Sequence, residues 1–320
     1  MKNVETLIGV TNIVPRLDDD ILGKIAEDVN TGYEIDVESR SQWEQKNKVS
    51  IELAEQVFEQ KDYPYKNAAN VKYPLIATAS IQFAARAYPE FVKNPDVIKC
   101  KVVGQDPQGL KAGRAERVGQ HMSYQCLNEM EEWEAETDKL LTYLPIVGTG
   151  FKKTYFSNVL GRNVSEFRRA NDLVINYWAK SMERAPRMTD VLVLYPNEIE
   201  ERIRSGLFVD FDYGRPTSTE DEEKDIATND PHQPHVFLEQ HTFYDLDGDG
   251  YNEPYIITFH KDTKKVVRIV ARFRNVEYKN NRISRIPAIQ YFTKFPFMPS
   301  ISGSIYDTGF GGLLGPINST

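Results

Sequence analysis

The sequence has few of the features that mark secreted or membrane proteins. Its 320 residues include only two cysteines, Cys100 and Cys126, which predicts two buried reduced thiols rather than a disulfide framework. No segment approaches the run of about 18 apolar residues that a membrane span requires. The first residues, MKNVETLIGV, lack the charged and apolar regions of a signal peptide. The sequence therefore predicts folding in a reducing cytoplasm.

Basic charge is also scarce. Lysine and arginine total 39 against 47 aspartate and glutamate residues, which gives a formal net charge of −8. An acidic balance argues against a dedicated nucleic-acid-binding surface. The apolar fraction of 40% and the charged fraction of 27% are those of a globular protein.

Patterns of catalytic sites are missing as well. No GxSxG elbow is present, and the glycine-rich stretches GTGF and GFGG lack the lysine of a phosphate-binding loop. No histidine has zinc-ligand spacing to another, and we expect His232 and His235 to be solvated. The sequence predicts no enzyme activity. A hydrolase with an unrecognised carboxylate site is the weakest of three functional hypotheses.

Helical patterns dominate the first half of the chain. We expect poor order up to about Pro15, then helical sequence from Asp18 that is clearest over residues 41–60. A second helix, buried because it is apolar on most sides, is expected over residues 75–87, before Pro89. The remaining expectations are a strand over residues 97–103 and one long helix over residues 110–144, stopped by Pro145.

The second half changes character. Short runs rich in β-branched and aromatic residues predict strands, namely FKKTYF, DLVINYW, MTDVLVLY, HVFLEQHTFY, EPYIITFH, KVVRIVARF and IPAIQYF. One short helix is expected over residues 197–205, and an exposed polar loop over residues 215–234. Helices first and strands afterwards predict an α+β fold. The expected segments are an N-terminal arm (1–40), a helical part (41–150), a β-rich part (151–305) and the start of a further helix (306–320).

The sharpest local motif is DLDGDG. Asp245, Asp247 and Asp249 alternate before Gly250, a pattern that can wrap a hard cation such as Ca²⁺, with Glu253 or a backbone carbonyl near Tyr251 completing the oxygen shell. An EF-hand also needs a glutamate at loop position 12, where Ile256 stands, and the flanks read as strands. The alternative is an acidic turn that uses Asp and Gly for backbone geometry. A calcium-dependent β-rich binding module is accordingly the second functional hypothesis.

A basic stretch lies between residues 261 and 285, with nine lysines and arginines against two acids. A basic strand pair could contact DNA phosphates or a neighbouring subunit. The residues that would do so are Lys264, Lys265, Arg268, Arg272 and Arg274. A solvated sheet face, or a salt-bridge surface between subunits that uses the many acidic residues of the chain, is the commoner explanation of such a stretch, and we favour it here.

Several blocks of sequence, in order, carry a family resemblance. They are KNAANVKYPLI with QFAARAYPE, KVVGQDPQG, RAERVGQHMSYQ, EEWEAETDKLLTYLPIVGTGFKKTYFSNVLGRNVSE, NDLVINYWAKSMERAPRMTD, LYPNEIEERIRSGLF, EQHTFYDLDGDGYNEPYIITFH, and YFTKFPFMPS with GFGGLLGPINS. Together they span most of residues 63–319, and they resemble the tailed-phage portal (head-to-tail connector) proteins of the podovirus type.

The resemblance implies a first functional hypothesis, a structural subunit of a ring, usually a dodecamer, at the capsid vertex of a virion assembled in the host cytoplasm. Such a ring would pass double-stranded DNA during packaging and ejection, and would bind terminase, scaffolding, capsid and tail proteins. Family members are about twice as long as this chain. The chain is therefore expected to match the N-terminal part of the peripheral wing and to reach the start of a stem helix. The resemblance implies no cofactor and no membrane contact.

Overall fold

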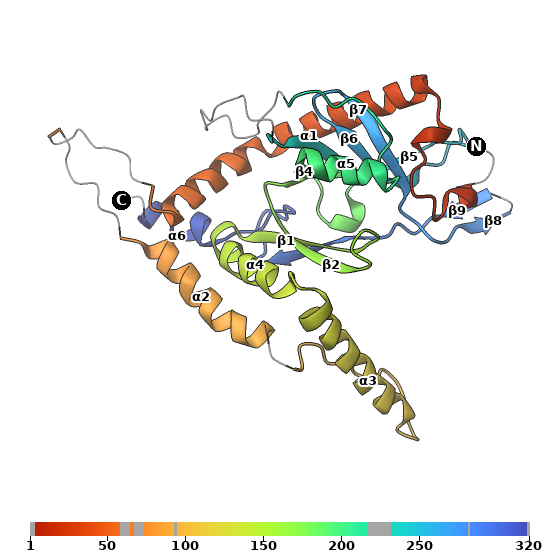
Figure 1. Cartoon of the computed structure of the whole chain (residues 1–320). Helices are drawn as coiled ribbons and strands as arrows, with labels where there is room; N and C mark the ends of the chain where they lie inside the picture. Colours follow the sequence, from red (N-terminus) through yellow and green to blue (C-terminus); the bar gives the residue numbers. More distant parts are fainter. Residues whose placement is uncertain are drawn as a thin grey trace. The chain divides into compact units, whose positions relative to one another are not determined.

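A computed structural model describes residues 4–57, 65–66, 73–92, 95–216, 232–280 and 282–318 (Figure 1). It confirms the predicted α+β class, because helices α1 to α4 come first and antiparallel sheets follow. No helix in the described ranges combines the length and the apolar character that crossing a bilayer requires. The polar loop expected over residues 215–234 lies mostly outside the described residues.

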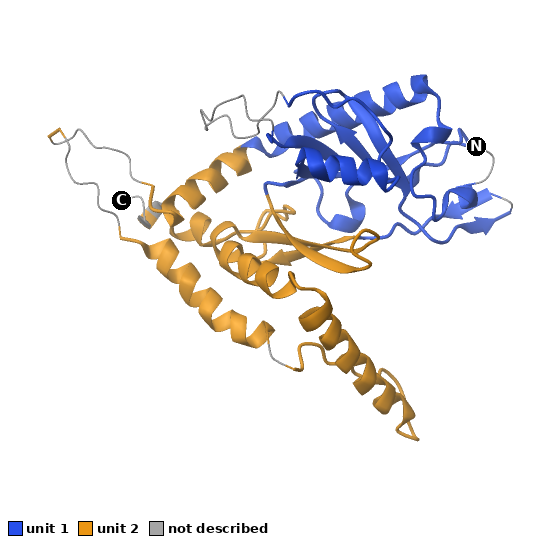
Figure 2. Ribbon diagram, in the orientation of Figure 1, with its two compact units in different colours: residues 1–41, 171–290 blue, residues 42–170, 291–320 orange. Residues whose placement is uncertain are grey.

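The chain forms two compact units that are interleaved along the sequence (Figure 2). Unit 1 comprises Met1–Ser41 and Asn171–Gln290, and unit 2 comprises Gln42–Ala170 and Tyr291–Thr320. The segments expected from the sequence follow one another along the chain, whereas each unit combines two separate stretches. Helix α1 (Asp19–Ala54) begins in unit 1 and continues into unit 2.

Unit 1 is built on a five-stranded antiparallel sheet in which neighbours in sequence are neighbours in space. The strands are β3 (Leu173–Ile175), β4 (Met188–Leu194), β5 (His235–Tyr244), β6 (Glu253–His260) and β7 (Lys265–Ala271). A separate hairpin pairs β8 (Glu277–Lys279) with β9 (Arg282–Arg285). The bounds of β5 and β6 match the prediction residue for residue, since both are apolar and β-branched runs with turn residues between them.

The two faces of this sheet bury two different clusters. Leu238 of β5 packs with Ile25 and Val29 of α1 on one face. Its neighbour Phe237 points to the other face, where it packs with Ile199 of α5 (Pro196–Arg204) and with Phe208. Successive side chains of a strand point to opposite faces. One strand therefore serves both layers.

The N-terminal segment is part of the core, so the expectation of poor order up to Pro15 was wrong. Val4 and Leu7 are buried in the cluster that contains Leu238. The Asn12 amide Nδ2 donates to the Val267 carbonyl at 2.9 Å, and the Ile13 N–H donates to the Ile269 carbonyl at 2.9 Å. These bonds hold the segment along β7, a long-range pairing that local propensity does not reveal.

In its described residues, unit 2 contains a three-stranded antiparallel sheet of order β10-β1-β2 and five α-helical segments. The strands are β1 (Thr149–Ser157), β2 (Arg162–Arg169) and β10 (Phe292–Pro296). The helices are the C-terminal part of α1, α2 (Leu75–Phe91), α3 (Leu110–Tyr124), α4 (Trp133–Val147) and α6 (Phe310–Asn318). The run IPAIQYF was predicted as a strand, but only its last residue, Phe292, lies in one.

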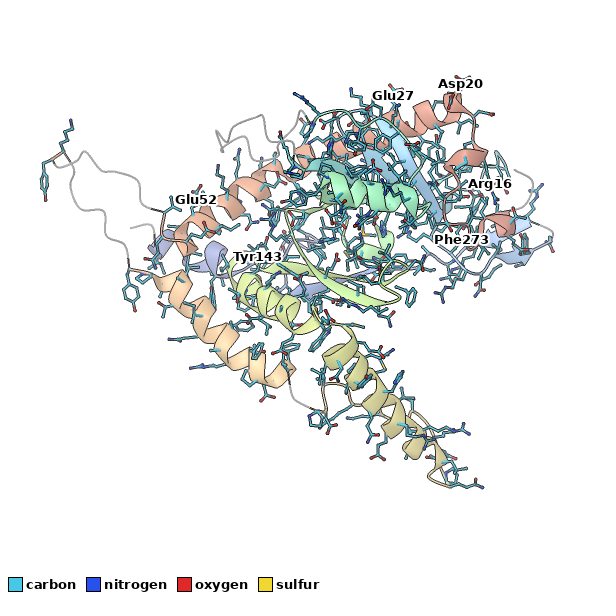
Figure 3. All side chains as sticks on the ribbon, in the orientation of Figure 1. Arg16, Asp20, Glu27, Glu52, Tyr143 and Phe273 are labelled. Atoms are coloured by element: carbon cyan, nitrogen blue, oxygen red, sulfur yellow. The ribbon has the colours of Figure 1, made fainter. Side chains whose placement is uncertain are left out.

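Helix α4 covers the sheet of unit 2. Leu140, Leu141 and Leu144 are buried on its inner side. Tyr143 packs edge to face on Phe167 of β2, with ring centroids 5.3 Å apart (Tyr143 is labelled in Figure 3). These contacts fix α4 on β1 and β2 through aliphatic and aromatic side chains.

Close backbone approach explains the glycines after α4. Gly148 has φ +96, and a Cβ placed on it would lie 2.3 Å from the Thr308 carbonyl carbon. A Cβ on Gly309 would lie 2.3 Å from the Ile146 carbonyl oxygen. The backbone before α6 thus lies directly against the end of α4, at a distance that only glycine permits.

The predicted long helix over residues 110–144 is wrong in two respects. A π-helical turn over Gln125–Glu129 and the non-helical Met130, with ψ 82, separate α3 from α4. Pro145 lies inside α4, as Pro89 lies inside α2. Each proline has only two helical residues after it. Each proline ring removes one backbone hydrogen bond in the last turn of its helix, where few helical residues follow.

Three smaller expectations also differ. Residues 97–103 form no strand, and Val103 is 94% exposed. Helix α2 buries only Ile76 and Ser80 and leaves Ile81 66% exposed, although its sequence predicted a buried helix. Cys100 and Cys126 are free thiols, as predicted, but both are half-buried rather than buried.

Candidate functional site

The loop between β5 and β6 brings the four predicted metal-binding side chains together. One carboxylate oxygen from each of Asp245, Asp247, Asp249 and Glu253 lies within 4.8 Å of the others. The loop is short because Tyr244 and Glu253 pair directly at the ends of the two strands. Gly248 and Gly250, with φ +76 and +88, allow the chain to turn within it.

Backbone N–H groups hold the aspartates in place. The Gly248 and Gly250 N–H groups donate to the two oxygens of Asp245, at 2.7 and 2.9 Å. The Tyr251 N–H donates to Asp249 Oδ1 at 2.7 Å. The bond from Gly250 is the main reason why the pKa of Asp245 lies below its usual value. The turn thus favours an ionised Asp245.

Glu253 differs from the aspartates because it is fully buried. Its Oε2 accepts hydrogen bonds from the Tyr255 hydroxyl at 3.3 Å and from the Leu246 N–H at 3.5 Å. Its Oε1 is buried and has no hydrogen-bond partner. Burial, and then repulsion from Asp247, raises the pKa of Glu253 to about 7. A buried acceptor left without a partner costs about 1–3 kcal/mol.

The five basic residues proposed as a DNA or subunit contact do not form one surface. Lys264 and Lys265 are exposed at the turn that begins β7, whereas Arg274 is exposed three residues after β7 ends. Arg268 lies between them, half-buried, and its Nε donates to the Thr11 carbonyl at 3.4 Å. A seven-residue strand is about 20 Å long, so the two exposed ends are far apart.

Arg272 is not available as an exposed contact, which corrects its inclusion in the basic set. It is 2% exposed. Its guanidinium lies 5.4 Å from the centroid of the Phe243 ring, and its Nη1 lies 3.5 Å from Gln290 Oε1. The side chain packs inside unit 1, a position that a count of basic residues does not distinguish from the surface.

Two histidines that were given no role from the sequence meet inside unit 1. His235 and His260 are both buried, with His235 Nδ1 3.1 Å from His260 Nε2, and Asp262 lies close to both. Burial and repulsion from His235 lower the pKa of His260 to about 4. The expectation that His235 is solvated was wrong. The β5–β6 pairing could have revealed the contact, because Phe237 stands opposite His260.

A buried lysine in unit 2 was also missed. Lys152 Nζ donates to Thr137 Oγ1 at 2.6 Å and lies 5.1 Å from the centroid of the Trp133 ring. Burial lowers its pKa to about 8. Lys152 lies on β1 beneath α4, and its hydrogen bond to Thr137 therefore joins the helix to the sheet.

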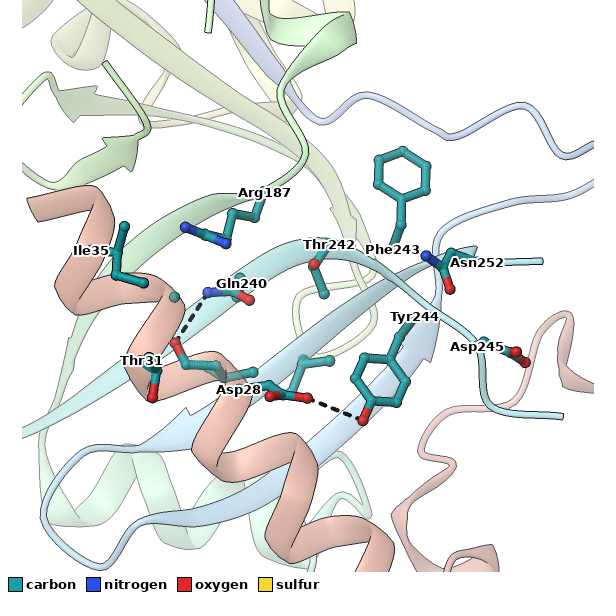
Figure 4. A pocket seen from close by; sticks show the side chains of 13 residues that line it. Asp28, Thr31, Ile35, Arg187, Gln240, Thr242, Phe243, Tyr244, Asp245 and Asn252 are labelled. Carbon is teal, nitrogen blue, oxygen red and sulfur yellow. Dashed lines mark hydrogen bonds between the residues drawn. The ribbon is translucent and has the colours of Figure 1, made fainter. Parts of the chain in front are cut away.

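Unit 1 contains a cavity of about 580 Å³ between α1 and β5 (Figure 4). Its polar lining is largely engaged in internal bonds. The Tyr244 hydroxyl donates to Asp28 Oδ2 at 3.2 Å, and Gln240 Nε2 donates to the Val29 carbonyl at 3.3 Å. Arg187, also at its edge, pairs with Asp36 at 2.6 Å. Asp245 borders the cavity as well, so the cavity adjoins the acidic loop.

Unit 2 exposes an unusual number of large apolar side chains. Among them are Ile81 and Phe91 of α2, Leu110, Val118, Met122 and Tyr124 of α3, and Phe156, Val159 and Leu160 of the β1–β2 hairpin. We call these residues the apolar surface. Figure 1 shows α3 extending away from the β10-β1-β2 sheet, so that the sheet does not cover this helix.

Comparison of the sequence with protein-family models and with curated proteins gave no match.

Proposed function

We propose that the chain is a wing portion of a phage portal subunit and forms a ring around a symmetry axis. The ordered sequence blocks over residues 63–319 support this proposal, and so does the succession of helices and antiparallel sheets. The function is structural. Its mechanism is the geometry of identical subunits that close a ring and leave a central conduit for double-stranded DNA.

The observation that carries the proposal is the apolar surface of unit 2. Helix α2 is apolar over most of its length, yet Ile81 and Phe91 are 66% and 52% exposed. On α3, Val118 and Met122 follow each other at a spacing of four and are also exposed. Exposed apolar side chains on successive turns of a helix are typical of a surface that another chain covers. In a cyclic ring every subunit covers such a surface on its neighbour.

The charge of the chain fits a conduit better than a tight DNA-binding surface. A net charge of −8 gives no overall attraction for phosphates, so any contact with DNA has to come from local basic groups. Of the five basic residues considered above, the exposed Lys264, Lys265 and Arg274 are divided between the two ends of β7. Weak contact lets DNA slide, whereas a continuous basic patch would hold it. Terminase, scaffolding, capsid and tail proteins are proposed partners on the strength of the resemblance.

Light scattering coupled to size exclusion, followed by negative-stain microscopy, tests the proposal. We expect closed rings of about a dozen subunits from the purified chain. Replacing Ile81 by Asp should shift the population towards monomers, because a charge would then have to be buried between subunits. Ile301→Asp is the matched control, since Ile301 is fully exposed on a loop outside the apolar surface. A wild-type chain that stays monomeric at every concentration tested would contradict the ring.

A further inference from the structure

The four clustered carboxylates of the β5–β6 loop have the spacing of a cation shell. Their oxygens lie within 4.8 Å of one another. Protein oxygens bind Ca²⁺ at 2.3–2.6 Å, so opposite ligands of one ion stand about 4.6–5.2 Å apart. The oxygens of Asp245, Asp247, Asp249 and Glu253 therefore fit around a single ion with little movement.

The buried Glu253 supplies an independent reason to expect a ligand. Its side chain is fully buried, and Oε1 has no hydrogen-bond partner. Within the described part of the chain, no lysine or arginine forms an ion pair with any of the four carboxylates. An acidic turn used only for its backbone geometry has no need of a buried fourth carboxylate. A cation is the partner that such an oxygen lacks.

We propose that this loop binds one Ca²⁺ ion. Counted from Asp245, the aspartates occupy positions 1, 3 and 5, the Tyr251 carbonyl position 7 and Glu253 position 9, which are ligand positions of calcium loops. All these ligands are oxygens, which favours a hard cation over zinc. Ca²⁺ accepts six to eight oxygens in flexible geometry, whereas Mg²⁺ keeps most of its water. The proposal is independent of ring formation.

The bound ion would cross-link the loop residues at the end of the β5–β6 hairpin and so stabilise unit 1. It would offset the repulsion among four carboxylates at the end of the β5–β6 hairpin. Leu246 and Tyr251, which border the ligands, pack against the cluster that holds the N-terminal segment. The Tyr251 hydroxyl also accepts the Ile286 N–H at 3.2 Å. Ordering the loop should therefore stabilise the whole unit rather than the loop alone.

Calorimetric titration of the full chain with CaCl₂, after treatment with a chelator, tests the site directly. We expect saturable binding of one ion per chain and a melting temperature that rises by several degrees at a hundredfold excess over Kd. Mg²⁺ at the same concentration should have a smaller effect. No heat and an unchanged melting temperature with millimolar Ca²⁺ would overturn the proposal.

Two variants locate the site. Glu253→Gln keeps the size of the side chain and Asp249→Asn keeps its shape, and each should lower the affinity for Ca²⁺ at least tenfold. Without calcium, Glu253→Gln should melt no lower than the wild type, because it removes a buried carboxylate. The controls Glu183→Gln and Asp210→Asn change exposed acids outside the loop and should leave the affinity unaltered. Wild-type affinity in both loop variants would overturn the proposal.

A measurement on the wild-type chain guards against variants that fail to fold. Tb³⁺ occupies calcium sites and emits when a nearby tyrosine is excited, and Tyr251 lies within the loop. We expect Tb³⁺ emission that Ca²⁺ displaces competitively and Mg²⁺ displaces poorly. Emission that Ca²⁺ does not displace would contradict a calcium site.

Discussion

The two units handle their apolar residues differently. Unit 1 buries an apolar cluster on each face of its five-stranded sheet and exposes fewer large apolar side chains than unit 2, although Trp178 is among them. Unit 2 buries the inner side of α4 but leaves the apolar surface of α2, α3 and the β1–β2 hairpin exposed. Under the proposed ring, unit 1 would gain its stability from internal packing, whereas the apolar surface of unit 2 would contact a neighbouring subunit.

The difference between the units is tested most strongly by replacing one isoleucine with alanine in each of them. Ile257 of β6 is 1% exposed and Ile81 of α2 is 66% exposed. Ile257→Ala should lower the free energy of unfolding by about 4 kcal/mol, because it removes buried methylene groups and leaves a cavity. Ile81→Ala should change it by less than about 0.5 kcal/mol in the monomer. Urea unfolding measures both, and equal losses would abolish the distinction.

Unit 2 is nevertheless tightly packed where α4 meets the backbone before α6. Gly148→Ala should cost about 3 kcal/mol. Alanine disfavours the positive φ of this position, and its Cβ would also overlap the backbone before α6. Gly161→Ala is the control, since Gly161 has φ +65 but nothing within 4 Å of the place that a Cβ would take. It should cost about 1 kcal/mol. Thermal melts of the two variants separate packing from backbone strain, and matching melts would argue against the close contact.

Buried charge gives a third comparison within unit 1. Asp36 is fully buried and accepts two bonds from Arg187, at 2.6 and 2.8 Å. Arg187→Met should cost about 2–3 kcal/mol, since it leaves a buried carboxylate without its main partner. The pair Arg204–Glu200 is 3.6 Å long and exposed. Arg204→Met should cost less than about 0.5 kcal/mol, and denaturant titration of both variants tests the difference.

The last comparison concerns pH, and its effect is small at each step of pH. The pKa of His260 is about 4 in the folded protein against an ordinary value of 6.5, so the unfolded chain binds the proton more readily. Stability should therefore fall as pH drops from 6.5 towards 4, by about 1 kcal/mol per pH unit near pH 5. Unfolding measured from pH 4 to 7 should show a shallower slope for His260→Gln. A wild-type slope in His260→Gln would contradict the lowered pKa of His260.

Local pattern was enough to predict elements whose neighbours in sequence are also their neighbours in space. Strands β5 and β6 and helix α5 were found within a residue because alternation, turn residues and a stop at Gly206 are all local signals. The same holds for the three aspartates of the acidic loop. Their clustering follows from the spacing of two within one turn.

Long-range contacts could not be predicted in this way. The N-terminal segment was expected to be poorly ordered because its partner β7 lies some 250 residues further along the chain. The burial of Glu253 and of Arg272, and the contact of His235 with His260, depend on strand register and on what covers the sheet. The prediction for helix α2 was wrong in the opposite direction. Its apolar sequence predicted burial, but nothing in the described part of the chain covers Ile81.

The hydrogen bond from Asn12 to Val267 also sets a constraint on biosynthesis. The two residues are 255 positions apart. At 5–20 residues per second, a ribosome needs roughly 10–50 s to make the intervening chain. The sheet of unit 2 also cannot form completely until late in translation, because β1 pairs with β10. During translation the apolar N-terminal segment must stay soluble without its sheet, so a chaperone that binds short apolar segments should improve the yield of folded protein.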